Sequence, residues 1–238
     1  MGTAEVVSRL RSMADPRSVE GMARYGISTG NALGISVTNL RKVAKEIGRD
    51  HRMALELWAT GIHEARILAA IIDEPGKVSR RQMDRWAKDF DSWDVCDQAC
   101  TCLFDRTPHA IDKAVEWSRR EEEFVKRAGF ALIAGLAAHD KAAPDEVFAG
   151  FLEHVKRESD DDRKYVRKAV NWALRQIGKR NVRLNGLAIS CAEDIATVDS
   201  RAARWIASDA LRELRSEAVQ RRLAAKRPGA RPARYRKS

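Results

Sequence analysis

Apolar residues recur at helical spacing along almost the whole chain, and no segment shows the sustained alternation of a half-buried strand. Short breakers rich in Gly, Pro, Ser, Thr or Asp, such as Gly48-Arg-Asp, supply the stops and caps that successive helices need. The predicted helices span roughly residues 3–14, 17–25, 36–48, 51–60, 63–73, 79–89, 92–104, 108–117, 121–138, 144–157, 161–179, 183–195 and 199–216. The spacing therefore predicts an all-α fold.

Short loops between these helices make sequence neighbours antiparallel, which favours helical hairpins stacked in a row over one bundle. Weak internal similarity supports the stack. Phe124-Val-Lys-Arg-Ala and Tyr165-Val-Arg-Lys-Ala share a core, and Val125 and Val166 lie 41 residues apart, within the range of HEAT-type repeats. We therefore predict a curved α-solenoid of HEAT-like repeats over residues 1–217.

The net charge of +10 is concentrated at the C-terminal end. From Ala218 onward the chain has eight basic residues and no acidic one, and it loses apolar periodicity. We expect residues 218–238 to be a disordered polybasic tail. Residues 1–217 keep 36 basic against 34 acidic groups, so a basic surface on the folded body must come from clustering.

Two features bear on the cellular compartment. No stretch approaches the roughly 18 apolar residues that span a bilayer, and the first residues do not resemble a secretion signal. We expect a cytoplasmic protein, without a membrane partner.

The four cysteines are Cys96, Cys100, Cys102 and Cys191. Three of them crowd one helical segment, without a second Cys/His pair at the spacing that zinc needs. Small buried apolar residues in a reducing cell are the favoured interpretation, and a metal or redox site is the alternative.

The segment Asp91-Ser-Trp-Asp-Val-Cys-Asp97 opens a predicted helix with Trp93 and Asp97 one turn apart on one face. An aromatic face beside a carboxylate suits a reaction in which positive charge develops on a sugar. The alternative is that Trp93 packs in the core while the acids favour the helix dipole. The residues alone favour this second interpretation.

Two further positions are ambiguous by themselves. Arg127 on a concave face would bind phosphate, or else it would form a solvated ion pair with one of Glu121 to Glu123. Trp172 stands among Ala and Leu at helical spacing, where a buried aromatic is the commoner explanation.

Taken together, these positions resemble the AlkD-type alkylpurine DNA glycosylases, which are built from HEAT-like hairpins. The resemblance runs from Tyr25-Gly-Ile to the helix that holds Trp172. Three motifs carry it, in order: Trp93-Asp-Val-Cys-Asp97, Lys126-Arg127 and Lys168-Ala-Val-Asn-Trp-Ala-Leu-Arg175. The family often has a second aromatic residue before its motif tryptophan, where this chain has Ser92.

The resemblance implies excision of cationic N3- or N7-alkylated purines from double-stranded DNA, without a cofactor or metal and without a deep base pocket. It implies that Trp93 and Trp172 pack against the deoxyribose, that Asp97 stabilises the sugar cation and orients water, and that Arg127 holds a phosphate. Lys126, Lys168 and Arg175 are expected to bind DNA as well.

Glu64 and Arg66 are expected to shape the same face, with no catalytic role assigned to them. A monomer associated with the nucleoid is the form that such an enzyme implies. Two alternatives remain: a helical-repeat protein that binds the DNA backbone without catalysis, and a scaffold for a protein partner.

Overall fold

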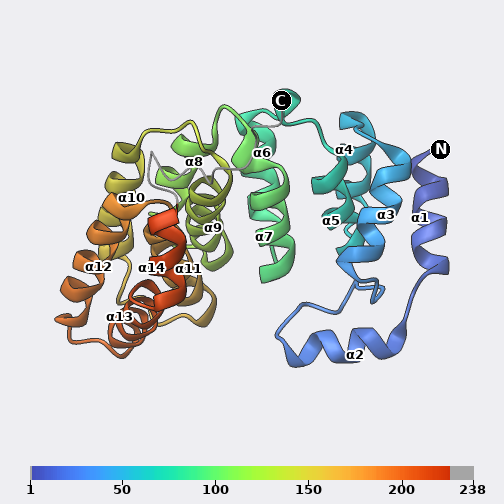
Figure 1. The fold of residues 1–238 in the computed structure, drawn as a ribbon. Coiled ribbons are helices and arrows are strands. Elements are labelled where there is room, and N and C mark those ends of the chain that lie inside the picture. Colours follow the sequence, from blue (N-terminus) through green and yellow to red (C-terminus); the bar gives the residue numbers. More distant parts are fainter. Residues whose placement is uncertain (1, 226–238) are drawn as a thin grey trace, which may run out of the picture. The chain divides into compact units, whose positions relative to one another are not determined.

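Helices account for nearly all the regular structure in the computed structural model, which describes residues 2–225 (Figure 1). No strand occurs within that range. The α-helices are α1 (Thr3–Ser12), α2 (Pro16–Arg24), α3 (Val37–Ile47), α4 (His51–Ala59), α5 (His63–Ile72), α6 (Arg80–Lys88), α7 (Trp93–Cys102), α8 (Ala110–Trp117), α9 (Glu123–His139), α10 (Asp145–Arg157), α11 (Lys164–Gly178), α12 (Val182–Ala196), α13 (Arg201–Leu214) and α14 (Glu217–Ala225). Two 3-10 turns, η1 (Pro75–Lys77) and η2 (Phe104–Arg106), complete the list.

Polar side chains begin many of these helices, because the first turn of a helix leaves backbone N–H groups without partners. Asp50 accepts the Met53 N–H at 2.9 Å, and Asn181 accepts the Leu184 N–H at 2.9 Å. Further side-chain caps are Asp15, Ser36, Ser79, Ser200 and Ser216. The polar breaker residues in the sequence therefore mark the helix starts, because their side chains accept hydrogen bonds from backbone N–H groups of the first turn.

The described chain forms two compact units that divide between Leu136 and Ala137. In the first unit, α5 contacts α3 on one side and α7 on the other, and α4 packs against α5 as its hairpin partner. Aromatic rings fill the interior. Trp58 stacks on Trp86 with ring centroids 3.9 Å apart, and Phe104 bridges from Trp86 to Trp117 at about 6 Å.

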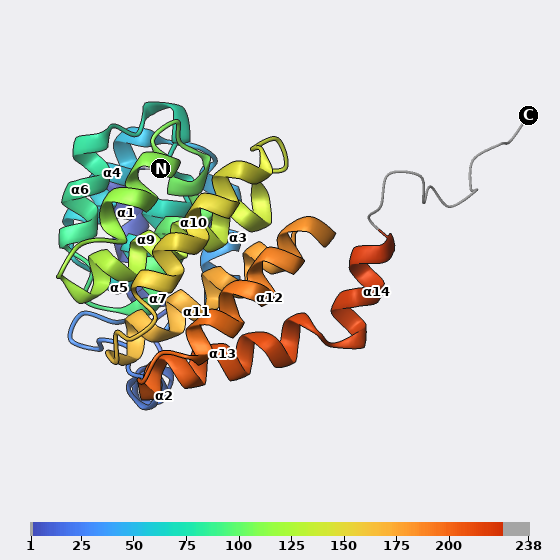
Figure 2. The same cartoon turned by 90° about the vertical axis from the view of Figure 1, so that its left-hand side faces the viewer.

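The second unit consists of α10 to α14, in which α12 contacts α10, α11 and α13 (Figure 2). Polar pairs line up along α11 and α13. Arg167 lies over the Trp205 ring, Asn171 donates to Asp209 at 2.7 Å and Arg175 donates to Glu213 at 2.6 Å. Each pair joins residues 38 apart, one turn beyond the previous pair. This ladder sets the register of the two helices.

The sequence predicted the helices well but misplaced the end of the fold. The all-α class and the stacked hairpins are confirmed, and most predicted helix ends lie within a few residues of those observed. The prediction of disorder from residue 218 is wrong for its first part, because α14 runs to Ala225. Val219 and Leu223, four residues apart, are buried and hold this helix. The rest of the predicted tail, 226–238, lies outside the described residues, and the single predicted repeat domain is divided into two units.

Within the range that the structure describes, none of the helices combines the length and the apolar character needed to cross a membrane.

We predict that Gly129→Ala destabilises the protein, because a Cβ at this position of α9 would fall on the backbone of Ser118 and 2.8 Å from the carbonyl carbon of Trp117. Backbone cannot move aside cheaply, so we expect a loss of about 1–3 kcal/mol in the free energy of unfolding, measured by urea denaturation. Gly186→Ala in α12 is the control, since nothing lies within 4 Å of the added methyl group. Alanine should there stabilise the helix by up to about 1 kcal/mol. Equal effects of the two substitutions would contradict the close approach.

Candidate active site

Helix α7 presents one partly exposed face, and the predicted site begins there. Val95, Cys96, Ala99 and Cys100 turn inward and are buried. Trp93 and Asp97 are only partly buried and lie one turn apart on the opposite side. The predicted helix, and with it the shared face, is confirmed.

Asp97 is joined to Arg127 of α9 by a two-pronged ion pair. The Arg127 Nε donates to Oδ1 at 2.9 Å, and Nη2 donates to Oδ2 at 2.7 Å. The pair is nearly buried, with 7% of the arginine side chain and 16% of the aspartate side chain exposed. Fork-to-carboxylate geometry of this kind fixes the orientation of both groups. The carboxylate is therefore held in one place rather than left to rotate in solvent.

Burial and charge act in opposite directions on this pair. Burial raises the pKa of Asp97, and the positive charge and hydrogen bonds of Arg127 oppose that rise. For Arg127, burial alone would lower the pKa, but the charge and hydrogen bonds of the Asp97 carboxylate oppose burial and the pKa is raised. The guanidinium therefore stays charged, and its charge offsets the cost of burying the Asp97 carboxylate.

The indole of Trp93 completes the cluster. The Arg127 Cζ lies 5.9 Å from the Trp93 ring centroid, within the range of a cation–π contact. At the other end of the ring, Nε1 donates to the backbone carbonyl of Tyr25 at 3.2 Å. The ring is thus anchored at its edge by the chain that follows α2, while the site retains an aromatic surface beside the carboxylate.

Asp94, the first acid of the motif, has a different role. The His63 Nε2 lies 2.8 Å from Asp94 Oδ2, and the buried Ser92 hydroxyl donates to Oδ1 at 2.6 Å. Ser92 in turn accepts the Ser28 N–H at 3.4 Å. This network ties α5 and the chain after α2 to the start of α7. Ser92, which stands where the resembling family often has an aromatic residue, is therefore a buried structural residue here.

Glu64, next to His63, is fully buried and holds a backbone turn. Its carboxylate accepts N–H groups from Leu33, Gly34 and Ile35 at 2.7 to 3.2 Å. Gly34 has φ +82°, and an added Cβ would fall on the Asp15 carbonyl, so glycine is needed there. Glu64 thus shapes the turn behind the site, through backbone contacts that sequence spacing does not display.

Several of the predicted site residues contact other groups of the protein. Arg127 forms an ion pair with Asp97, a partner that the sequence did not predict. Arg66 donates to the Asp89 carbonyl at 3.0 Å and lies over Trp58. Lys126 is buried. The predictions that Lys126 and Arg127 bind DNA stay predictions.

Three predicted residues belong to α11 in the second unit. Trp172 is partly buried and Lys168 is exposed. Arg175 pairs with Glu213 at 2.6 Å and with Asp209 at 3.5 Å, so its charge is already shared between two carboxylates. The roles predicted for these residues remain untested.

Two of the three clustered cysteines are buried as predicted, whereas Cys102 is partly exposed. Cys96 and Cys100 are fully buried, and each thiol donates to a backbone carbonyl of α9 at 3.6 Å. Burial raises the pKa of Cys100 well above its usual value of 9, so this thiol is inert. Among the residues that the structure describes, no group of three or more His, Cys, Asp or Glu side chains is arranged to hold a metal ion.

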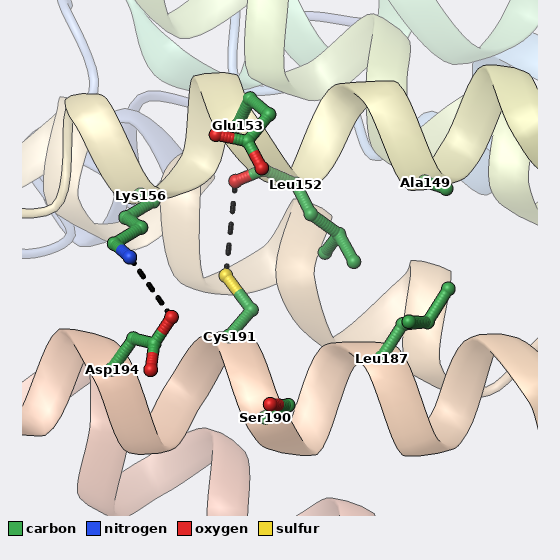
Figure 3. A pocket seen from close by; sticks show the side chains of 8 residues that line it. All are labelled: Ala149, Leu152, Glu153, Lys156, Leu187, Ser190, Cys191 and Asp194. Atoms are coloured by element: carbon green, nitrogen blue, oxygen red, sulfur yellow. Dashed lines mark hydrogen bonds and ion pairs between the residues drawn. The ribbon is translucent and has the colours of Figure 1, made fainter.

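A hollow of about 310 Å³ lies between α10 and α12 in the second unit, and Figure 3 shows its lining. Lys156 pairs with Asp194 across it at 2.9 Å, and the Cys191 thiol donates to the Leu152 carbonyl at 3.7 Å. Burial raises the pKa of Cys191 to about 12, so the thiol is protonated near neutrality and is a poor nucleophile. None of the predicted site residues lines this hollow.

The described helices form an all-α repeat fold, and α7 and α9 bring a tryptophan, an aspartate and an arginine together in it. The sequence model described as DNA alkylation repair enzyme matches residues 6–214, and the chain belongs to that family. A solved structure described as "A new family of proteins related to the HEAT-like repeat DNA glycosylases with affinity for branched DNA structures" is similar, with a TM-score of 0.76 and 22% identity, over 90% of this chain and 95% of that one. Uncharacterized protein Lin0241 of Listeria innocua serovar 6a is 19% identical over 195 residues, which cover 80% of this chain and 85% of that protein.

We predict that the His63–Asp94 contact stabilises the protein most in mildly acidic solution. Burial alone would lower the pKa of His63, but Asp94, together with the charges of Glu64 and Asp91, outweighs burial and raises it above 6.5. Burial alone would raise the pKa of Asp94, but His63 lowers it below 3.8. The histidine contribution is complete below 6.5 and is lost as pH rises through the folded pKa, whereas the aspartate contribution is present above 3.8 and is lost in stronger acid.

His63→Gln should therefore lower the free energy of unfolding by about 2 kcal/mol near pH 5 and by clearly less at pH 8. Urea denaturation at the two pH values measures the difference. His109→Gln, at a histidine with no contact to Asp94, is the control and should show no such trend. A His63→Gln loss of the same size at both pH values would mean that the charged contact is not what stabilises the site.

Proposed function

We propose that the protein is a DNA glycosylase that releases positively charged N3- or N7-alkylated purines from duplex DNA. The observation that carries the proposal is the meeting of Trp93, Asp97 and Arg127 on the partly exposed face of α7. Membership of the DNA alkylation repair enzyme family supports it. The reaction needs no cofactor, since the lesion already carries the positive charge that makes it a good leaving group.

In the proposed reaction, the bond between C1′ of the sugar and the purine nitrogen breaks, and its electron pair leaves with the base and neutralises the alkylpurine cation. Positive charge then develops on the sugar. Asp97 stabilises that charge and orients the water that attacks C1′, and the water proton passes to the carboxylate or to solvent. The products are the free alkylated base and an abasic site.

Arg127 serves this proposal as a positioning residue. Two of its donors hold both oxygens of Asp97, which keeps the carboxylate aimed without side-chain reorganisation during the reaction. The Trp93 ring offers the sugar cation an aromatic face next to the carboxylate. Trp172 is proposed, from the family resemblance, to pack against the deoxyribose as well.

We predict that Asp97→Asn slows release of 7-methylguanine from a methylated duplex by about a hundredfold or more, because it removes the negative charge that faces the sugar cation. DNA affinity should change little. The rate is measured as free base under single-turnover conditions with saturating protein. Asp112→Asn, which breaks an exposed aspartate–arginine pair with Arg80 elsewhere in the first unit, is the matched control and should leave the rate unchanged.

Loss of the charge also leaves Arg127 buried without its partner, so thermal unfolding of each variant is measured alongside. Arg127→Lys gives a second test that keeps the positive charge but loses the fork, and it should slow release with Asp97 still present. An Asp97→Asn variant that is folded and as fast as the wild-type protein would overturn the mechanism.

The second candidate is binding to DNA without base release. It is favoured by the engagement of both Asp97 oxygens with Arg127, and the solved relative is described as having affinity for branched DNA structures. In that case the wild-type protein would bind duplex or four-way-junction DNA in a salt-dependent way and liberate no base from methylated DNA.

A further inference from the structure

A basic pocket opens in the first unit, where the C-terminal ends of α3, α5 and α7 come together. It has a volume of about 510 Å³. Its lining residues are Arg41, Ala44, Lys45, Gly48, Arg49, Ile71, Cys102 and Arg106. Four of these are cations and none is an acid. In a folded body that is nearly neutral by composition, this is the clustering that an anion-binding surface requires.

Within residues 2–225, three of the four pocket cations make no ion pair, and the fourth, Arg106, makes only a long one. Within the described range, neither Arg41 nor Lys45 makes an ion pair, and both are exposed. Arg49 is held by the backbone carbonyls of Ile71 and Asp73, which fix its place and leave its charge intact. Arg106 lies 3.9 Å from a buried Asp105 oxygen, at the outer limit of an ion pair.

The negative ends of the helix dipoles offset only part of the positive charge in the pocket. The C-terminal end of a helix carries about half a negative charge, so three helix ends offset less than half of four full positive charges. Arg49 is engaged with carbonyls at the end of α5, whereas Arg41, Lys45 and Arg106 make no such bond within residues 2–225. The remaining positive charge favours an anionic ligand.

The pocket lies at the C-terminal end of α7, the helix that carries the candidate active site. Gln98, Thr101 and Cys102 continue the partly exposed face beyond Asp97. Cys102 is five residues after Asp97, which is about 7.5 Å along a helix. That length corresponds to about two nucleotides at 3.4 Å each along one DNA strand.

We propose that this pocket binds a backbone phosphate of DNA about two nucleotides from the nucleotide that Asp97 faces. The inference rests on the proposed function in one respect, namely that DNA lies along α7. The pocket supplies affinity that does not depend on base sequence, and it sets the register of the strand relative to the active site. Arg41, Lys45 and Arg106 contact the phosphate, and Arg49 adds a fixed positive charge.

Two lysines of α3 give a closely matched first test. Lys42 and Lys45 are both exposed, and neither makes an ion pair within the described residues, but only Lys45 lines the pocket. Lys45→Ala should weaken binding to an undamaged duplex and reduce the slope of log affinity against log salt by about 0.9, whereas Lys42→Ala should change both much less. Equal effects of the two variants would overturn the proposal.

The double variant Arg41→Ala/Lys45→Ala should lose roughly tenfold or more in affinity, with a change in salt slope of about 1.8. Its control is Arg81→Ala/Arg85→Ala on α6, which removes the same charge with the same four-residue spacing from outside the pocket. Calorimetric titration with inorganic phosphate separates a small-anion site from a DNA site. Saturable phosphate binding that the double variant loses, with its DNA affinity unchanged, would overturn the proposal.

The register is tested with a duplex that holds one tetrahydrofuran abasic site and, in turn, one uncharged methylphosphonate at each flanking position. Neutralising the phosphate about two nucleotides away should weaken wild-type binding and leave the double variant unaffected. The same loss in both proteins would contradict the assigned contact.

Base release separates this inference from the proposed function. If the wild-type protein releases no base but Lys45→Ala weakens DNA binding more than Lys42→Ala, the glycosylase proposal is rejected and the phosphate-site proposal stands. Release at the wild-type rate by the double variant at subsaturating protein, with unchanged affinity, would reject the site and keep the glycosylase.

Discussion

Neighbouring helical hairpins in this protein are held in register by polar contacts at nearly constant separations along the chain. In the first unit, His63 meets Asp94, Trp58 meets Asp89 and Asp97 meets Arg127, over 30 or 31 residues. In the second unit Asn181 meets Asp145 and the buried Asn171 meets Asp209, over 36 and 38 residues. Apolar packing alone would allow one helix to slide against the next, whereas a buried polar group that loses its partner is costly. These contacts therefore select one arrangement.

The candidate active site is built from the same kind of contact. Asp94 and Asp97 stand one turn apart in sequence terms, yet Asp94 links α7 backward to α5 and Asp97 links it forward to α9. One short motif thus connects α5, α7 and α9. Side chains on this face of α7 are therefore held in place by contacts to both neighbouring helices. Preorganised charge of this kind is what a reaction through a cationic sugar requires, because no reorganisation is needed when the charge develops.

Sequence patterns predicted the parts of this fold that depend on local chemistry. Helical spacing and caps such as Asp50 and Asn181 act within a few residues, so the helices could be read from the chain. The Asp97–Arg127 pair, the His63–Asp94 contact and the Glu64 turn join residues about 30 apart, and many pairings of such groups are compatible with one sequence. Motif order singled out Asp97 and Arg127, but nothing local showed that they bind each other. The helix at the C-terminal end was missed because two apolar residues, Val219 and Leu223, are too weak a pattern among arginines.

The first unit has a nearly neutral candidate active site and, separately, a positively charged pocket. A lone carboxylate on a DNA-binding face would repel phosphates, but Asp97 is paired with Arg127, so the candidate active site is close to neutral as a whole. A neutral site can act on a sugar cation but contributes little attraction for the backbone. That attraction must come from unpaired positive charge elsewhere. The net charge of residues 1–217 is close to zero, so such charge must be locally clustered. The four cations at the ends of α3, α5 and α7 concentrate it in one pocket, a short distance along α7 from the carboxylate. Under the proposed function, catalysis and DNA affinity could be adjusted separately, since none of the pocket residues belongs to the Asp97–Arg127 pair.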